Sequence, residues 1–325
     1  MRTVTELRSA LAPVRQAALS RPTHAGVVTG IGGARVATRI GLVPTMGALH
    51  EGHLSLIRCA REQCDVVVVS LFVNPAQFDE GADLELYPRR EADDARLAER
   101  AGADILFVPA IEEVYPEGFS TAVEVFGLTG RLEGASRGAS HFRGVTTVVT
   151  KLLNMVSPDI AYFGQKDAQQ VAVIKRMVAD LDIPVGIVVC PTERERDGLA
   201  MSSRNARLDP DQRTQAGALF ESLEKAADLA RAGEHSAEQL VRVAHETLVA
   251  RGVEPEYLEL VDPLTFERID SLAATALLVV AARVGAVRLI DNEVLQPAVV
   301  HTAGVADSSD SPTSHLPTGA TTCSA

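Results

Sequence analysis

The sequence has few of the features that mark secreted and membrane proteins. Its four cysteines stand at positions 59, 64, 190 and 323 without a CxxC pair, so we expect free thiols in a reducing compartment. Cys59 and Cys64 are expected to pack within a helix rather than to bind a metal. Residues 1–7 lack the apolar core of a signal peptide, and no apolar run approaches the roughly 20 residues that span a bilayer. We therefore expect a cytoplasmic protein.

The chain also lacks an excess of positive charge. It has 31 Lys and Arg residues against 43 Asp and Glu residues, which gives a formal net charge of −12. This balance argues against a broad electrostatic contact with nucleic acid or with an anionic membrane. We expect neither as a partner; local basic sites are compatible with this net charge.

What the sequence does contain is a regular alternation of strand and helix patterns. A chain of 325 residues with 46% apolar content suits two domains. The continuous β-branched run at residues 66–72 is typical of a strand that is covered on both faces. Strand patterns at residues 40–43, 66–72, 105–108, 160–163 and 185–189 alternate with helical patterns, one of which is predicted at residues 145–156. This alternation predicts an α/β fold with a parallel, doubly wound sheet.

The pattern changes after residue 207. Helices are predicted at residues 211–232 and 237–251, and three strand-like runs follow, which indicates a smaller α+β domain across the active-site edge. The C-terminal tail is rich in Ser, Thr, Pro and Gly and has little to bury, so we expect disorder there. The predicted division is residues 1–191, 192–300 and 301–325.

Polar clusters follow four of the predicted strands, at residues 44–53, 74–78, 164–167 and 190–205. Ligands of open parallel sheets gather at the carboxyl ends of the strands, so these clusters are expected to meet. His50 and His53 stand at a strand-to-helix turn whose backbone N–H groups and helix dipole suit a phosphate. Zinc is the alternative ligand for two histidines, but no further Cys or His lies nearby at ligand spacing. Imidazoles that hydrogen-bond nucleotide phosphates fit better, because fixed donors stabilise the charge that develops there.

Other groups in these clusters also suit anions. Lys166 stands in a strand-to-helix turn, and Ser202, Ser203 and Arg204 bring two hydroxyls and a guanidinium. Each cluster alone is compatible with a solvated loop, but several at one sheet edge predict an anion site. The adjacent carboxylates of residues 93 and 94 suggest Mg²⁺ binding by Asp93 and Asp94, and the solvated face of a charged helix is the alternative.

Five stretches together resemble the pantoate–β-alanine ligase family of the HxGH nucleotidyltransferase superfamily. They follow one another in order, at residues 44–53, 72–78, 141–145, 162–170 and 197–205, and the resemblance extends from about residue 5 to about residue 293. It implies a Rossmann-like domain with a small C-terminal domain that closes over ATP, usually in a homodimer. It also implies that pantoate is joined to β-alanine with ATP and Mg²⁺, through a pantoyl adenylate.

The resemblance further implies roles for individual residues. Gln77 and Gln170 would bind the substrates pantoate and β-alanine, and His53 stands at the position of the proton donor. The catalytic set that it implies is His53, His50, Lys166, Ser202, Ser203 and Arg204. The ATP site that it implies comprises Met46, Gly47, Ala48, Leu49, His50, Glu51, Gly52, His53, Gly164, Gln165, Lys166, Asp167, Glu193, Met201, Ser202, Ser203 and Arg204. Residues 137–141 are one residue longer than the usual family stretch, which affects the flap before His141.

Three other functions are compatible with parts of this pattern. A related adenylyltransferase would share His50, His53 and Ser202 but would not need Gln77 together with Gln170. A catalytically silent nucleotide-binding regulator would tolerate the loss of Lys166 or His53, and both residues are present. A tRNA-linked role is disfavoured by the acidic net charge.

Overall fold

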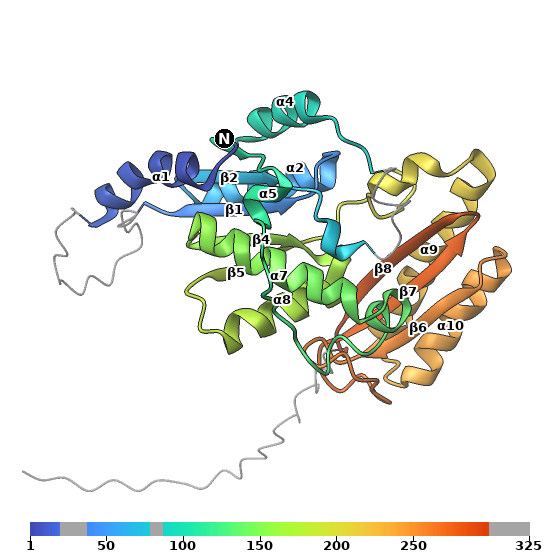
Figure 1. The fold of residues 1–325 in the computed structure, drawn as a ribbon. Helices are drawn as coiled ribbons and strands as arrows, with labels where there is room; N and C mark the ends of the chain where they lie inside the picture. Colours follow the sequence, from blue (N-terminus) through green and yellow to red (C-terminus); the bar gives the residue numbers. More distant parts are fainter. Residues whose placement is uncertain (20–37, 79–86, 299–325) are drawn as a thin grey trace, which may run out of the picture.

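Two sheets organise residues 1–19, 38–78 and 87–298, which are the residues that the computed structural model describes (Figure 1). The larger sheet is parallel, with the strand order β3-β2-β1-β4-β5. Its strands are β1 (Ile40–Thr45), β2 (Val66–Leu71), β3 (Ile105–Phe107), β4 (Ile160–Gly164) and β5 (Gly186–Cys190). The strand order reverses direction between β1 and β4, as in Rossmann-like folds, so the predicted fold class is confirmed.

Helices cover both faces of this sheet because successive strand residues point to opposite sides. In β1, Leu42 belongs to one core cluster and Val43 to the other. The cluster with Leu42 is completed by α1 (Val4–Leu19), α7 (Ala139–Val156) and α8 (Ala168–Asp180). The cluster with Val43 is completed by α2 (Glu51–Gln63) and α4 (Glu91–Ala101). This double covering accounts for the uninterrupted apolar run in β2.

The flap before His141 is helical. The short helix α6 (Glu133–Arg137) ends at Gly138, whose φ of 86° lies in the left-handed region, and α7 starts at the next residue. Glycine is suited to this abrupt change of chain direction because it has no Cβ to clash. The helix that the sequence suggested only from residue 145 therefore begins earlier, and His141 lies inside its first turns.

A second, antiparallel sheet of order β6-β7-β8 forms the C-terminal part of the described chain. It consists of β6 (Pro255–Val261), β7 (Ala276–Val284) and β8 (Val287–Leu295), with α9 (Pro210–Arg231) and α10 (Ala237–Ala250) on one face. Leu278 and Val280 of β7 pack with these helices, whereas Leu277 and Val279 join the core of the large sheet. The central strand β7 is thus buried on both faces, and the small sheet lies against the large domain (Figure 1).

The predicted domain boundary and the predicted tail are not tested by these helices and strands. The predicted domain boundary between residues 191 and 192 stays a prediction, and the predicted tail, residues 301–325, lies outside the described residues. Among the helices that the structure describes, none combines the length and the apolar character needed to cross a membrane.

Candidate active site

Two adjoining cavities lie where the carboxyl ends of β1, β4 and β5 face the small sheet. The first, which we call the histidine cavity, has a volume of about 230 Å³ and is lined by His50 and His53. The second, which we call the interdomain cavity, has a volume of about 370 Å³ and lies between α6 and strands β7 and β8. Six residues line both cavities: Met46, Gln77, Lys166, Asp167, Gln170 and Arg204. The site therefore occupies the crevice that the reversal of strand order predicts.

The two histidines form a compact pair at the start of α2. His50 is the N-cap residue, and its backbone N–H donates to His53 Nδ1 over 3.4 Å. This contact assigns the proton of His53 to Nε2, which then serves as a donor. The two rings lie 4.1 Å apart, and a Cβ at Gly52 would be 3.0 Å from Nδ1 of His50. Glycine between the histidines therefore makes room for the His50 imidazole.

Both imidazoles are neutral near pH 7. Burial, followed by the positive charge of Lys166, lowers the pKa of His50 to about 4. Burial, followed by the neighbouring His50 and Lys166, lowers the pKa of His53 to about 3. A neutral imidazole can donate one N–H to a phosphate without adding a full charge to the site.

Asp94 braces the turn that carries the histidines. Its carboxylate oxygens accept hydrogen bonds from the backbone N–H groups of Ala48 at 2.9 Å and Leu49 at 2.8 Å. The side chain is buried, unlike the solvated face that was the alternative for this helix. These two N–H groups therefore donate within the protein. The expectation that the backbone N–H groups of this turn bind a phosphate is wrong for these two.

These contacts also bear on the predicted Mg²⁺ site. Asp93 is exposed and pairs with Arg96, while both carboxylate oxygens of Asp94 face backbone donors. Within the described parts of the chain, no group of three or more His, Cys, Asp or Glu side chains is arranged to hold a metal ion. The pair therefore does not fit a magnesium site in this arrangement, and Mg²⁺ binding there stays a prediction without geometric support.

Gln77 is held by a network that follows β2. Its side-chain oxygen accepts a hydrogen bond from Asn74 Nδ2 at 3.0 Å, and its side-chain nitrogen lies 3.0 Å from the sulfur of Met46. Asn74 also accepts from the hydroxyl of Tyr115 at 2.8 Å. A Cβ at Gly144 would lie 2.2 Å from the carbonyl oxygen of residue 76, so glycine allows α7 to approach this loop closely.

The neighbouring glutamines of α8 have different environments. Gln169 is buried and donates to the carbonyls of Leu128 and Arg131, while its oxygen accepts from the backbone N–H of Glu133 at 3.0 Å. Gln170 lines both cavities. Gln169 is thus hydrogen-bonded to the protein's own backbone and lines only the interdomain cavity, whereas Gln170 borders both cavities.

Strand β8 holds the turn that carries Lys166. The side-chain nitrogen of Asn292 donates to the carbonyls of Gln165 and Lys166, both at 3.0 Å, and its oxygen accepts from the side chain of Gln165 at 3.0 Å. The adjacent Asp291 is buried and forms a two-pronged ion pair with Arg194, at 2.6 and 3.1 Å. Two consecutive residues of the small sheet therefore fix the turn at residues 165–167 and the loop that starts at residue 191.

The serine loop comes next in sequence. Ser202 caps the turn η3 (Ser203–Arg207), with its hydroxyl accepting from the backbone N–H of Arg204 at 3.3 Å. The carbonyl of Glu193 accepts from the backbone N–H of Met201 at 2.9 Å, which folds this loop back onto itself. The loop therefore brings two hydroxyls and a guanidinium to the histidine cavity.

Most of the predicted site residues meet in the histidine cavity. The predicted residues that line it are Met46, His50, Gly52, His53, Gln77, Gly164, Lys166, Asp167, Gln170, Glu193, Met201, Ser202, Ser203 and Arg204. Those that line neither cavity are Gly47, Ala48, Leu49, Glu51, Gln165, Asp93 and Asp94. An apolar wall that was not predicted completes the cavity, with Phe72, Val145, Val148, Val149, Leu152 and Phe163.

Comparisons with known proteins agree on one family. A family model described as pantoate-β-alanine ligase matches residues 20–294. A pantothenate synthetase of Heliobacterium modesticaldum is 52% identical over 264 residues, which cover 81% of this chain and 94% of that protein. A pantothenate synthetase of Moorella thermoacetica is 54% identical over 259 residues, which cover 79% of this chain and 91% of that protein.

Solved structures show the same likeness. The crystal structure of pantothenate synthetase from Thermus thermophilus matches with a TM-score of 0.80 at 43% identity, covering 91% of this chain and 99% of that chain. A pantoate-β-alanine ligase from Francisella tularensis, complexed with β-γ ATP and β-alanine, matches with a TM-score of 0.67 at 33% identity. This second match covers 90% of this chain and 96% of that chain.

Proposed function

The chain belongs to the pantoate–β-alanine ligase family, and we propose that its histidine cavity performs the family reaction, the ATP-dependent joining of pantoate to β-alanine. One observation carries the assignment of this cavity. Phosphate-binding groups from three strand ends, represented by His53, Lys166 and Arg204, line the same space as Gln77 and Gln170. The groups suited to a nucleotide's phosphates and those suited to a small hydroxy acid therefore lie side by side.

The chemistry of pantoate fits the remaining walls. Its carboxylate and hydroxyl groups need donors and acceptors, which the neutral amides of Gln77 and Gln170 supply together. Its two methyl groups need an apolar surface, which Phe72, Val145 and Val149 provide. An acid without such a branched carbon would leave this apolar wall uncovered, so the wall favours pantoate over smaller acids.

In the first half-reaction, a carboxylate oxygen of pantoate attacks the α-phosphorus of ATP. A new P–O bond forms, the bond to the bridging oxygen breaks, and pyrophosphate leaves with the electron pair. Negative charge grows on the phosphate oxygens, and the fixed donors His50, His53 and Lys166 stabilise it. The Ser202 and Ser203 hydroxyls and Arg204 complete the cradle for the departing pyrophosphate.

In the second half-reaction, the amine of β-alanine attacks the acyl carbon of pantoyl adenylate. The ammonium group first loses one proton to water, the C–N bond forms, and the C–O bond to AMP breaks. The nitrogen then loses a second proton to water, which leaves the amide. The cavity contributes by holding the acyl carbon in line with the amine and by shielding that carbon from attack by water.

The wider setting follows from the resemblance. We propose a requirement for Mg²⁺ as the partner of ATP, a homodimer as the assembly, and the cytoplasm as the location. Chelation by EDTA that leaves the rate unchanged would reject the metal requirement. A monomeric mass by light scattering at micromolar concentration would reject the dimer.

The function is tested by measuring AMP and pantothenate together. The purified protein is given ATP, Mg²⁺ and pantoate, with and without β-alanine. We expect one pantothenate for each AMP, with steady AMP release only when both acids are present. AMP release that does not depend on pantoate, or steady AMP release that does not depend on β-alanine, would contradict the proposed function.

A further inference from the structure

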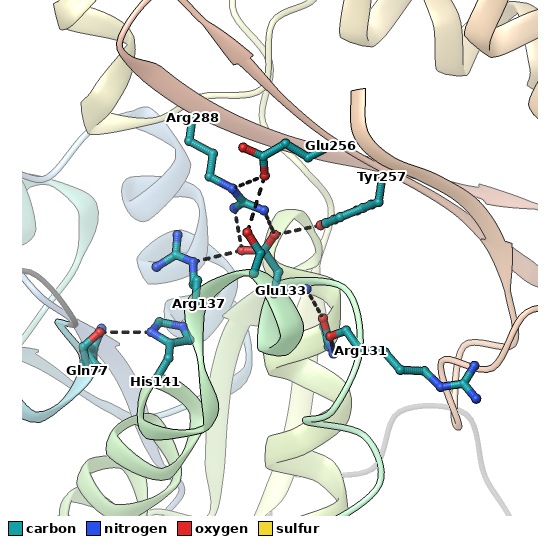
Figure 2. A network of polar contacts seen from close by, with 10 residues as sticks. Gln77, Arg131, Glu133, Arg137, His141, Glu256, Tyr257 and Arg288 are labelled. Carbon is teal, nitrogen blue, oxygen red and sulfur yellow. Dashed lines mark hydrogen bonds and ion pairs between the residues drawn. The ribbon is translucent and has the colours of Figure 1, made fainter. Parts of the chain in front are cut away.

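A cluster of charged residues joins α6 to the small sheet (Figure 2), and most of its members line the interdomain cavity. Glu133 lies at its centre, with its side chain 11% exposed, and its two oxygens accept from Arg288 at 2.7 and 2.9 Å. The hydroxyl of Tyr257 donates to Glu133 at 2.8 Å, and Arg137 donates through Nε at 3.0 Å. Burial alone would raise the pKa of Glu133, but the hydrogen bonds and charges of Arg288 and Arg137 lower it. Glu133 is therefore an anion that fixes two arginines.

The two arginines are used to different extents. Arg288 directs Nε to Glu256 at 2.6 Å and both terminal nitrogens to Glu133, so each of its three nitrogens donates within the cluster. Arg137 uses only Nε for its ion pair with Glu133. Within the described residues, its two terminal nitrogens have no hydrogen-bonding partner, and its side chain is 28% exposed. Arg137 thus offers the edge of a guanidinium that binds a carboxylate through two parallel hydrogen bonds.

The charges of the cluster leave room for one more anion. Three guanidinium groups, from Arg137, Arg283 and Arg288, face the two carboxylates of Glu133 and Glu256. The balance is one positive charge. Arg283 is 64% exposed and pairs with Glu256, whereas the partly buried Arg137 shares its carboxylate partner, Glu133, with Arg288.

The other cations of the interdomain cavity have competing duties. Lys166 and Arg204 also line the histidine cavity, where the proposed function gives them the phosphates. Arg207 already has an interaction partner. Among the described cations around this cavity, Arg137 is therefore best placed to receive a second, small anion.

The place of Arg137 relative to the acyl carbon is also suitable. Figure 2 shows its guanidinium beside Glu133, with the terminal nitrogens turned away from that carboxylate, and His141 lies next to Arg137. The Nδ1 atom of His141 lies 3.0 Å from the carbonyl oxygen of Gln77. Arg137, Gln77 and Gln170 line one continuous space. In β-alanine only two methylene groups separate the amine from the carboxylate. A carboxylate held at Arg137 would direct the amine toward the acyl group bound by the two glutamines.

From this geometry we infer that Arg137 binds the carboxylate of β-alanine and so selects the amine that enters the second half-reaction. The inference rests on the proposed function and assigns one substrate of that reaction to the interdomain cavity. Glu133 acts as a positioning residue, since it holds Nε and leaves the terminal edge of Arg137 toward the cavity. An amine without a carboxylate would lack this contact.

The two half-reactions allow a specific test. Arg137→Met removes the guanidinium, while Arg137→Lys keeps the charge and loses the two-pronged geometry. We expect the KM for β-alanine to rise roughly 10- to 100-fold in Arg137→Met and less in Arg137→Lys. Pantoate-dependent exchange of labelled pyrophosphate into ATP, which needs no β-alanine, is expected to match the parent. The parent should prefer β-alanine strongly over propylamine, and Arg137→Met should lose most of that preference.

Arg283→Met is the matched control, because Arg283 lines the same cavity and belongs to the same cluster but is exposed. Its KM for β-alanine should stay within about twofold of the parent value, as for other exposed ion pairs. An unchanged KM and unchanged amine preference in Arg137→Met would overturn the inference. So would an equal loss of pyrophosphate exchange in both Arg137 variants at unchanged melting temperature, since Arg137 would then serve the first half-reaction. A parent protein that shows no pantoate-dependent exchange would instead reject the proposed function itself.

Discussion

The side-chain amide of Asn292 donates to the backbone carbonyl of Lys166 over 3.0 Å, although the two residues are 126 positions apart. The same side chain also donates to the backbone carbonyl of Gln165 and accepts from the side-chain amide of Gln165. The turn is therefore fixed by the small domain. Asp291, the preceding residue, anchors Arg194 in the other loop of the site. The small domain therefore positions two groups of the proposed phosphate-binding residues at once.

Asn292→Leu tests this positioning. The substitution removes three hydrogen bonds and leaves the carbonyls of residues 165 and 166 without their donor. Since a displacement of about 1 Å can cost roughly 100-fold in rate, we expect kcat/KM for ATP to fall about 10- to 100-fold. Val294→Ala on the exposed side of the same strand is the control and should leave the kinetics unchanged. Parent-like ATP kinetics in Asn292→Leu would refute the positioning role.

Gly52→Ala tests the packing of the histidine pair. The added Cβ would lie 3.0 Å from two atoms of the His50 ring, so the imidazole must move. We expect kcat to fall about 10- to 100-fold, as for the loss of one fixed donor, with little change in melting temperature. Gly217→Ala in α9 is the matched control, because an added Cβ there meets no atom within 4 Å. That variant should keep full activity and gain about 0.5–1 kcal/mol of stability. A fully active Gly52→Ala would show that His50 need not hold this position.

Asp94→Ala separates a structural carboxylate from a metal ligand. It leaves the backbone N–H groups of Ala48 and Leu49 without acceptors, so we expect a loss of about 2–4 kcal/mol in the free energy of unfolding. Asp93→Ala removes only an exposed ion pair with Arg96 and should cost less than about 0.5 kcal/mol. Urea denaturation measures both changes. A higher Mg²⁺ requirement in Asp93→Ala would contradict the structural interpretation and support the metal site.

The charge state of the histidine pair can be followed by NMR. Burial, with Lys166 nearby, keeps the pKa of His50 near 4 and that of His53 near 3, against an ordinary value of 6.5. The ring Cε1–H signals of both residues are therefore expected to stay at neutral-form shifts down to about pH 5. A titration midpoint near 6.5 for either ring would contradict the buried, neutral pair.

The same shifts set a direction for stability. Between the folded and the ordinary pKa values, the unfolded chain binds protons that the folded chain excludes, so this contribution to stability falls as pH drops below about 6.5. His53→Asn should reduce this acid sensitivity. The measurement is the urea midpoint of parent and variant at pH 7 and pH 5. An equal loss for both proteins would argue against the assigned pKa of His53.

Most of the fold could be predicted from local sequence patterns. The β-branched run in β2 predicted a strand buried on both faces, and polar residues after the strands predicted where the site lies. His50, His53 and Lys166 were recognisable because each stands at a strand-to-helix turn, a place with its own sequence pattern. Gln170 was found only through the family resemblance, since a partly buried glutamine on a helix has no pattern of its own.

The bracing residues were not predictable in the same way. Asp94 and Asn292 act on turns that are 45 and 126 positions away, and no period in the sequence records such contacts. A usable signal was present in β8, where Asp291 and Asn292 interrupt a strand with two adjacent buried polar residues. Buried polar groups require partners, so such a pair marks a contact even when its partner is unknown. The early start of α7 was missed because one helix ends at Gly138, with a positive φ, and the next begins at the following residue, so the sequence holds no separate loop between them.

The proposed function depends most on the histidine cavity as the place where pantoate is adenylated. The direct measurement is incorporation of labelled pyrophosphate into ATP, with pantoate present and β-alanine absent. We predict exchange that requires pantoate in the parent and falls by about two orders of magnitude or more in His53→Ala and Lys166→Ala, at melting temperatures close to the parent. Exchange that proceeds without pantoate, or near-parent exchange in either variant, would contradict the account.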